Sequence, residues 1–127
     1  MPLNILYVDD EPDIREVATF SLEVDPDIVV TSFDSGPAAL RALDAGLTPD
    51  AILLDVMMPG MDGPATLGHI RERALFKATP VVFITARAQS QEQAHFCALG
   101  AVGVITKPFD PMTLAGQLRA LLPETLG

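Results

Sequence analysis

The apolar positions along this chain change their spacing repeatedly. Short runs made almost wholly of apolar residues, typical of buried strands, alternate with longer segments in which apolar residues recur every three or four positions, as on one face of a helix. The expected strands are residues 4–8, 28–32, 51–54, 81–85 and 102–106. The expected helices are residues 12–24, 36–45, 64–75, 89–99 and 111–122. The pattern therefore predicts a β-α unit that is repeated five times.

Proline, aspartate and glycine support the ends of several of these helices. Pro12 and Pro111 suit a first helical turn, where the missing N–H needs no partner, and Asp110 is suited to cap the last helix. Gly46 and Gly100 directly follow helical segments, and glycine is common at that position. These helix ends are thus indicated by local signals as well as by periodicity.

Wholly apolar strands between helices favour one architecture. Strands that are buried on both faces belong to a parallel sheet with helices on each side. Right-handed crossovers then wind the chain into a doubly wound α/β sandwich. In such sheets the ligand site lies beyond the carboxyl ends of the strands. The residues directly at those ends are therefore the candidate site residues.

Polar side chains stand at the carboxyl ends of four of the five expected strands. In chain order they are Asp9, Asp10, Asp55, Thr85 and Lys107. Because the carboxyl ends of parallel strands meet at one edge of the sheet, we expect three carboxylates, a hydroxyl and an ammonium group to converge there.

This set of groups suits a metal ion and phosphoryl chemistry. Three carboxylates near one point repel one another unless a cation lies between them. Mg2+ prefers oxygen ligands and is typically held by one or two carboxylates together with phosphate oxygens. One or both of Asp9 and Asp10 are therefore expected to carry it, directly or through water. Asp55 is then either a third ligand or a nucleophile that attacks phosphorus. Lys107 and Thr85 would stabilise negative charge on a transferring phosphoryl group.

Composition narrows the class of protein. The 127 residues suit one domain, over 1–127, with no output domain. The formal net charge of −9 disfavours direct nucleic-acid binding, which needs clustered lysine and arginine. No apolar stretch approaches the roughly 20 residues of a membrane span, no signal peptide is evident, and the single Cys97 cannot form an internal disulfide. We therefore expect a cytoplasmic protein that does not contact a membrane.

Four separated motifs carry a resemblance to a known family. The segments VDDEPD, LLDVMMPGMDG, ITA and TKPF resemble, in order and spacing, those of the receiver domains of response regulators in two-component signalling. The likeness extends over nearly the whole chain. It implies a flavodoxin-like fold with strand order 2-1-3-4-5 and Mg2+ as cofactor. It also implies transfer of a phosphoryl group from a phosphohistidine, on a sensor histidine kinase or a histidine phosphotransfer protein, to an aspartate.

The resemblance also implies roles for individual residues. Asp55 corresponds to the phospho-acceptor and to a metal ligand, Asp10 to the direct metal ligand and Asp9 to a more distant one, and Met57 would bind Mg2+ through its backbone carbonyl. Thr85 and Lys107 correspond to the hydroxyl and the ammonium group that contact the phosphoryl group. Positions expected to modulate or transmit the switch are Met57, Ala86, Arg87, Val104 and Pro108, the last of which often follows a cis peptide bond in the family.

The sequence departs from the family pattern at one switch position. Receiver domains commonly have an aromatic residue three positions before the lysine, where this chain has Val104. Without a ring to move, the signal is expected to pass through the backbone of the fourth helix and the fifth strand. Gly63 ends the loop that follows Asp55 and contains the sequence MPGMDG (the acceptor loop). A glycine there is expected to provide either a positive φ or room for close packing.

Three other functions remain as alternatives. Each is associated with a sequence feature that this chain does not have. A phosphatase or phosphotransferase with separate substrates usually has an acid two positions after its nucleophilic aspartate, where this chain has Met57. A flavodoxin-like electron carrier would need a phosphate-binding loop after the first strand, where this chain has DDEPD. A pure interaction module would lack Asp10, Asp55 or Lys107. The leading interpretation is a phosphorylation-dependent switch, which is not a turnover enzyme and signals by altered protein binding.

Overall fold

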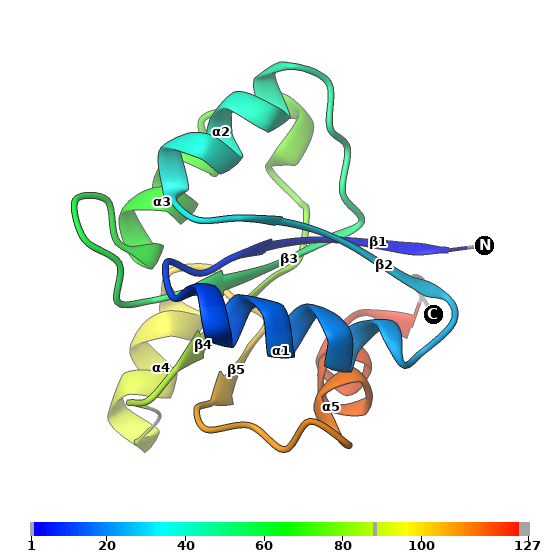
Figure 1. The fold of residues 1–127 in the computed structure, drawn as a ribbon. Coiled ribbons are helices and arrows are strands. Elements are labelled where there is room, and N and C mark those ends of the chain that lie inside the picture. Colours follow the sequence, from blue (N-terminus) through cyan, green and yellow to red (C-terminus); the bar gives the residue numbers. More distant parts are fainter. Residues whose placement is uncertain (1, 88, 125–127) are drawn as a thin grey trace.

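A single parallel sheet forms the centre of the fold. The computed structural model describes residues 2–87 and 89–124, and Figure 1 shows its five strands in the order β2-β1-β3-β4-β5. Every neighbouring pair is parallel. The strands are β1 (Leu3–Val8), β2 (Ile28–Phe33), β3 (Ala51–Asp55), β4 (Val81–Thr85) and β5 (Gly103–Thr106). The predicted doubly wound, flavodoxin-like fold is therefore confirmed.

Helices cover both faces of this sheet. They are α1 (Pro12–Glu23), α2 (Gly36–Asp44), α3 (Gly63–Arg71), α4 (Ser90–Ala98) and α5 (Leu114–Leu121). The pair α1 and α5 lies against one face, and α2 and α3 lie against the other (Figure 1). Phe96 of α4 is buried in the same cluster as Leu67 and Ile70 of α3, so α4 belongs to the second face. Within the described ranges no helix has the length and hydropathy that crossing a bilayer requires.

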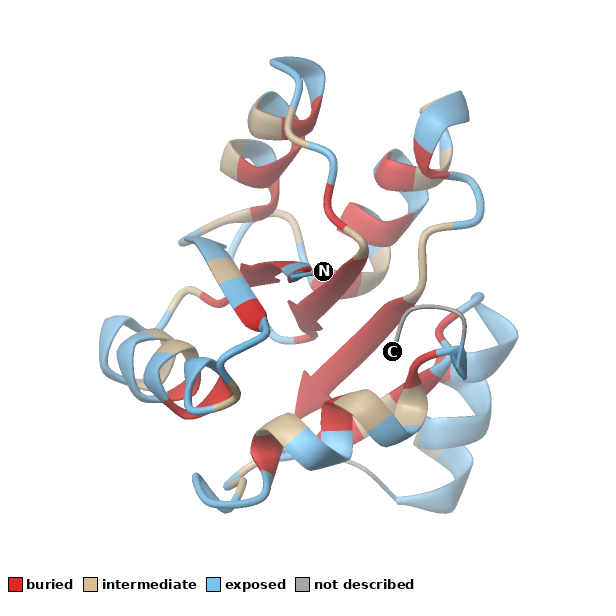
Figure 2. Cartoon of the chain, turned by 90° about the vertical axis from the view of Figure 1, so that its right-hand side faces the viewer, coloured by how far each residue is buried: buried red, intermediate tan, exposed pale blue. Residues whose placement is uncertain are grey.

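The core is divided into two clusters by the alternation of side chains along the strands. Leu6 and Val8 of β1 point into the cluster beneath α2 and α3, whereas Ile5 and Tyr7 point into the cluster beneath α1 and α5. All residues of β3 and β4 are buried, which is why these strands read as continuous apolar runs. Figure 2 shows these strands as buried, between helices whose outer faces are exposed. This closely packed centre determines where the strand ends lie.

The third helix is shorter than predicted. The expected helix 64–75 ends at Arg71, and a separate 3-10 helix η1 (Ala74–Phe76) follows. Arg73 between them has an extended backbone, with φ −89° and ψ 117°. The Arg71 guanidinium donates to the carbonyl oxygens of Phe76 and Thr79 at 2.8 and 2.7 Å. These bonds turn the chain so that Phe76 is buried in the core.

The last helix starts later than predicted. α5 begins at Leu114 rather than at Pro111, and residues 111–113 form a turn. The Asp110 carboxylate does accept a hydrogen bond from the Met112 N–H at 2.9 Å, as expected of a cap. Thr113, with φ −118° and ψ −5°, departs from regular helix geometry. The aspartate therefore closes a local turn, and the regular helix follows it.

Candidate functional site

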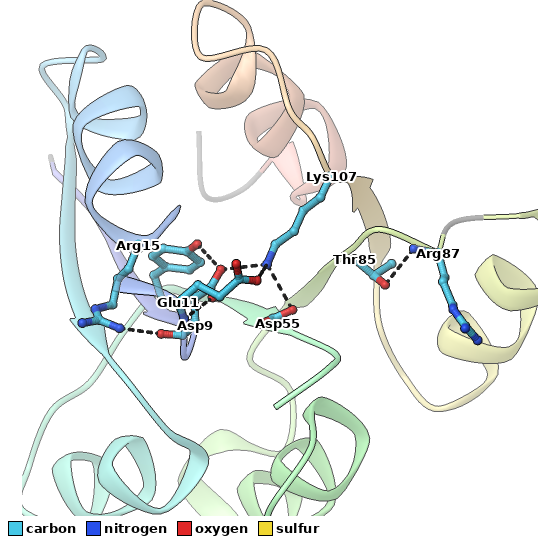
Figure 3. Close-up of polar contacts among 8 residues, drawn as sticks. Asp9, Glu11, Arg15, Asp55, Thr85, Arg87 and Lys107 are labelled. Atoms are coloured by element: carbon cyan, nitrogen blue, oxygen red, sulfur yellow. Dashed lines mark hydrogen bonds and ion pairs between the residues drawn. The ribbon is translucent and has the colours of Figure 1, made fainter. Parts of the chain in front are cut away.

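The ends of β1, β3, β4 and β5 bring the predicted polar residues to one edge of the sheet. Figure 3 shows Lys107 reaching from the end of β5 toward Asp9, Glu11 and Asp55. Asp55 is the last residue of β3 and lies beside Ile84, one residue before Thr85, in the ladder with β4. The parallel register thus places residues that are far apart in the sequence around one point.

Asp9 is fully buried. Both of its carboxylate oxygens accept hydrogen bonds, and one of them also forms an ion pair. Oδ1 accepts from the Glu11 N–H at 3.0 Å. Oδ2 accepts from the Tyr7 hydroxyl at 2.7 Å and lies 3.0 Å from Lys107 Nζ. The Arg15 guanidinium donates to the backbone carbonyl of Asp9 at 2.7 Å, which fixes the start of the β1–α1 loop. The charge of this carboxylate is therefore compensated by the protein itself.

Lys107 is shared among three carboxylates. Its Nζ lies 3.0 Å from Asp9, 3.3 Å from Asp55 and 3.7 Å from Glu11. Burial favours the neutral amine, but the hydrogen bond to Asp9 and the charges of Asp9 and Asp55 outweigh it and raise the pKa of Lys107. Its backbone N–H donates to the Thr85 carbonyl at 2.8 Å, and the peptide bond to Pro108 is cis. Lys107 is thus a fixed cation at the centre of the site.

Asp55 is a buried carboxylate with an altered proton affinity. Burial, the largest cause, and the charge of Asp9 raise its pKa to about 7, while Lys107 opposes this rise. Oδ1 faces Lys107, whereas the buried Oδ2 accepts no hydrogen bond from the described residues. A second cation at Oδ2 would favour the ionised, nucleophilic form.

The residues present fit a divalent metal ion. Asp9, Asp10, Glu11 and Asp55 each offer an oxygen, and these oxygens lie within 4.8 Å of one another. Asp10 Oδ1 is buried and, like Asp55 Oδ2, has no hydrogen-bond partner in the described part of the chain. A buried carboxylate oxygen without a donor is costly unless a cation pairs with it. These two oxygens therefore mark the side of the cluster that suits a hard cation such as Mg2+.

Thr85 lies at the same edge, but Arg87 does not face the acids. Thr85 is buried, and its Oγ1 accepts a hydrogen bond from the Arg87 N–H at 3.0 Å. A hydroxyl that accepts in this way still has its own proton to donate. The guanidinium of Arg87 points away from Asp55 in Figure 3. The structure therefore keeps Thr85 near the site and turns the predicted modulating group at Arg87 outward.

Gly63 packs directly against the backbone at the end of β3. A Cβ at this position would lie 2.5 Å from the Asp55 carbonyl oxygen and 2.9 Å from Val56 Cα. The positive-φ glycines among the described residues are elsewhere, at Gly46, Gly60 and Gly100. Of the two expected reasons for this glycine, close packing is therefore the one that applies.

The remaining predicted positions surround the site without entering the polar cluster. Met57 exposes 67% of its surface on the acceptor loop. Val104 is half-buried against the core, and Ala86 is exposed. The structure does not test the expected role of the Met57 carbonyl, which stays a prediction.

Sequence reasoning missed the parts played by Tyr7, Glu11 and Arg15. Tyr7 lies within an apolar run, so it reads as core; its position two residues before Asp9, on the same side of a strand, was the only signal for its hydroxyl. Glu11 extends the acidic run, and Arg15 lies one helical turn further along. Both contact the site only because the loop folds back on Asp9.

Comparisons with known proteins agree with this geometry. A sequence model of the response regulator receiver domain matches residues 5–119. The transcriptional regulatory protein CseB of Streptomyces avermitilis is 38% identical over 119 residues, which are 94% of this chain and 48% of that protein. The phosphate regulon transcriptional regulatory protein PhoB of Escherichia coli is 34% identical over 122 residues, which are 96% of this chain and 52% of that protein. The chain thus spans about half the length of these curated relatives.

A solved structure of a response regulator has the same fold, and the match covers that structure's whole chain. The chemotaxis response regulator CheY4 of Vibrio cholerae superposes with a TM-score of 0.86 at 31% identity, and the match covers 96% of this chain and 100% of that one. The family match, the relatives and the fold agree with the resemblance carried by the four motifs. The chain therefore belongs to the response regulator receiver domain family of two-component signalling.

Proposed function

We propose that this chain accepts a phosphoryl group on Asp55 from a phosphohistidine, on a sensor histidine kinase or a histidine phosphotransfer protein, in a Mg2+-dependent reaction. The observation that carries the proposal is the buried Asp55 carboxylate. Lys107 lies 3.3 Å from one of its oxygens, and the other oxygen, beside further acids, has no hydrogen-bond partner among residues 2–87 and 89–124. An aspartate between a lysine and a metal site is what acyl phosphate formation requires.

The protein's own residues supply the nucleophile and two hydrogen-bond donors for the phosphoryl transfer. A bond forms between an Asp55 oxygen and phosphorus while the bond from phosphorus to the donor imidazole nitrogen breaks. The nitrogen keeps that electron pair, and the donor leaves as neutral imidazole once the ring carries a proton. Lys107 and the Thr85 hydroxyl donate to the phosphoryl oxygens.

Mg2+ is proposed to be held by Asp10 and Asp55 directly, with Asp9 more distant and the Met57 carbonyl as a further ligand. When bound, it neutralises the negative charge of the carboxylates and of the incoming phosphoryl group. One buried oxygen on each of Asp10 and Asp55 lacks a hydrogen-bond partner in the part of the chain that the structure describes, and this supports the assignment.

The proposed output is a change in the binding of another protein, in the cytoplasm. Turnover of a separate substrate and direct contact with nucleic acid are not part of the proposal. The half-buried Val104 has no ring to move, so the signal passes through the backbone between Ala86 and Thr106. Beryllofluoride, a phosphoryl mimic, should therefore shift the amide NMR signals of this segment; unchanged signals there would contradict this route.

Intact mass after incubation with acetyl phosphate tests the proposed function. With Mg2+ we expect a gain of one phosphoryl group, about 80 Da, and with EDTA no gain. Asp55→Asn removes the acceptor and should show none. Asp34→Asn, a matched charge change on the exposed residue after β2, should behave as wild type. A folded wild-type protein that gains no mass under any condition would overturn the proposal.

The exposed Met57 is expected to lengthen the lifetime of the phosphorylated state. Met57 lies two residues after Asp55 and exposes 67% of its surface. The proposed role of its thioether is to limit the approach of water to the phosphoryl group. Met57→Asn should therefore shorten this lifetime severalfold, as followed by loss of the mass gain after the donor is removed. Arg87→Ala serves as the comparison, because its guanidinium points away from Asp55 and its loss should have little effect. Equal lifetimes of Met57→Asn and wild type would contradict the shielding role.

A further inference from the structure

The Tyr7 hydroxyl is a buried donor that the proposed phosphoryl transfer does not use. Tyr7 is 0% exposed and packs in the cluster beneath α1 and α5 with Ile5, Leu53 and Leu114. Its hydroxyl lies 2.7 Å from Asp9 Oδ2. Since phenylalanine would fill the same apolar space, the hydroxyl itself needs an explanation.

Two donors of different kinds share this one oxygen of Asp9. Lys107 Nζ lies 3.0 Å from Oδ2 and also 3.3 Å from Asp55 Oδ1, so it divides its hydrogen bonds between two carboxylates. The Tyr7 hydroxyl has one proton, which goes to Asp9. Tyr7 is therefore the donor at Oδ2 that does not depend on the state of Asp55.

A phosphoryl group on Asp55 would change the balance between these donors. It adds negative oxygens close to Lys107 Nζ, which then donates more strongly to them. Asp9, which is fully buried and the more distant ligand of the proposed Mg2+ site, would lose the part of its compensation that Lys107 supplies, and a buried carboxylate that lacks donors is costly. Among the described residues, the hydroxyl of Tyr7 and the N–H of Glu11 are the donors that remain.

We propose that Tyr7 is a positioning residue that holds Asp9 in place and compensates its charge, so that Lys107 is released to the phosphoryl group on Asp55. The inference rests on the proposed function. It gives Tyr7, which lies two positions before Asp9 on β1, a part in the switch that does not require contact with Asp55.

Removing the hydroxyl should move two binding constants in opposite directions. In Tyr7→Phe, Asp9 retains Lys107 more tightly, so beryllofluoride at saturating Mg2+ should bind about tenfold more weakly. The same Asp9 lacks one donor and gains more from a nearby cation, so Mg2+ alone should bind about threefold more tightly. A general loss of order would weaken both.

The experiment compares wild type, Tyr7→Phe and Ile5→Val. Ile5 precedes Tyr7 by two residues, is buried in the same cluster and has no polar contact with Asp9, so Ile5→Val reduces packing but keeps the hydroxyl. Calorimetric titration measures Mg2+ binding, and fluorine NMR measures beryllofluoride binding. Opposite shifts in Tyr7→Phe, with both constants of Ile5→Val near wild type, support the inference. Unchanged constants in Tyr7→Phe, or both weakened, would overturn it. Failure of wild type to bind either ligand would instead contradict the proposed function.

Wild-type fluorescence gives a second measurement that needs no variant. The chain has one tyrosine and no tryptophan, so its emission comes from Tyr7 alone. Beryllofluoride should draw Lys107 toward Asp55 and strengthen the bond from Tyr7 to Asp9, which is expected to quench the emission. A saturable quench is the expected result, and emission that stays constant while the fluorine signal shows binding would count against the inference.

Discussion

Lys107→Met is expected to lower the free energy of unfolding by about 3 kcal/mol at about pH 8 without divalent ions, because it removes one partner of a buried charge cluster. The Lys107 side chain is 13% exposed, and its carboxylate partners on Asp9 and Asp55 are 0% and 3% exposed. Without the ammonium group, these two carboxylates face each other with no cation between them. Urea unfolding followed by circular dichroism measures the loss.

The loss should depend on pH and on Mg2+ in a defined direction. Lys107 opposes the rise in the pKa of Asp55, so its removal raises that pKa further. The folded variant then binds a proton that the unfolded chain does not, and its deficit relative to wild type shrinks as the pH falls. Mg2+ should also raise the stability of the variant more than that of wild type, because a cation at the acids replaces part of the lost charge.

The control is Lys77→Met, which makes the same charge change at an exposed residue just after η1. An exposed lysine outside a specific contact contributes little to stability, so a change within about 0.5 kcal/mol is expected there. If Lys107→Met cost no more than Lys77→Met, the folded state would not depend on Lys107 to compensate the charges of Asp9 and Asp55.

Much of the sheet and the identity of the strand-end residues could be predicted from sequence. The runs around Leu53 and Phe83 are continuous because both faces of β3 and β4 are buried, so the pattern and the structure have one cause. Asp55 and Lys107 were identifiable because the carboxyl ends of parallel strands meet at one edge. No knowledge of side-chain contacts was needed for either inference.

Features that depend on contacts between distant residues could not be predicted. The break after Arg71 follows from hydrogen bonds to the carbonyl groups of Phe76 and Thr79, which local helix propensity does not register. The outward direction of Arg87 was likewise not encoded in its spacing from Thr85. The break after Arg71 is therefore set by tertiary contacts, which override local helix propensity.

The hydrogen bond of Tyr7 shows a different limit of the sequence pattern. A tyrosine in an apolar run satisfies the requirement for a buried side chain, so periodicity assigns it to the core, and this is correct. The pattern says nothing about the hydroxyl, whose partner lies at the end of the same strand. Polar atoms on largely apolar side chains can therefore contribute to a site without changing the pattern.

Asp55→Asn is expected to raise the free energy of unfolding by about 2 kcal/mol at about pH 8 without divalent ions. The pKa of Asp55 is raised from 3.8 to about 7 in the folded protein, first by burial and then by the charge of Asp9. Holding the ionised form at high pH therefore costs at most about 4 kcal/mol. The amide avoids the charge but must itself be hydrogen bonded when buried, so about half of that cost is expected to be recovered.

The direction of the pH dependence follows from where the proton is held. Between pH 3.8 and about 7 the folded wild type retains a proton on Asp55 that the unfolded chain has released. Over this window the contribution of Asp55 to stability falls as the pH rises, and above it the contribution stays low. The stability gain of Asp55→Asn should therefore grow from about pH 4 to pH 7 and then level off. A gain that is the same across this range would contradict a raised pKa.

A double variant tests whether the two effects have one physical origin. If Asp55 and Lys107 interact through their charges, Asp55→Asn should reduce the cost of Lys107→Met, and the double variant should be more stable than the sum of the single changes predicts. Asp9 remains charged in the double variant, so the cost of losing Lys107 should not vanish. Saturating Mg2+ should shrink the coupling, because the wild-type site then has a second cation beside Asp55. Additive effects without Mg2+ would mean that Lys107 stabilises the fold mainly through Asp9, with little dependence on the acceptor carboxylate.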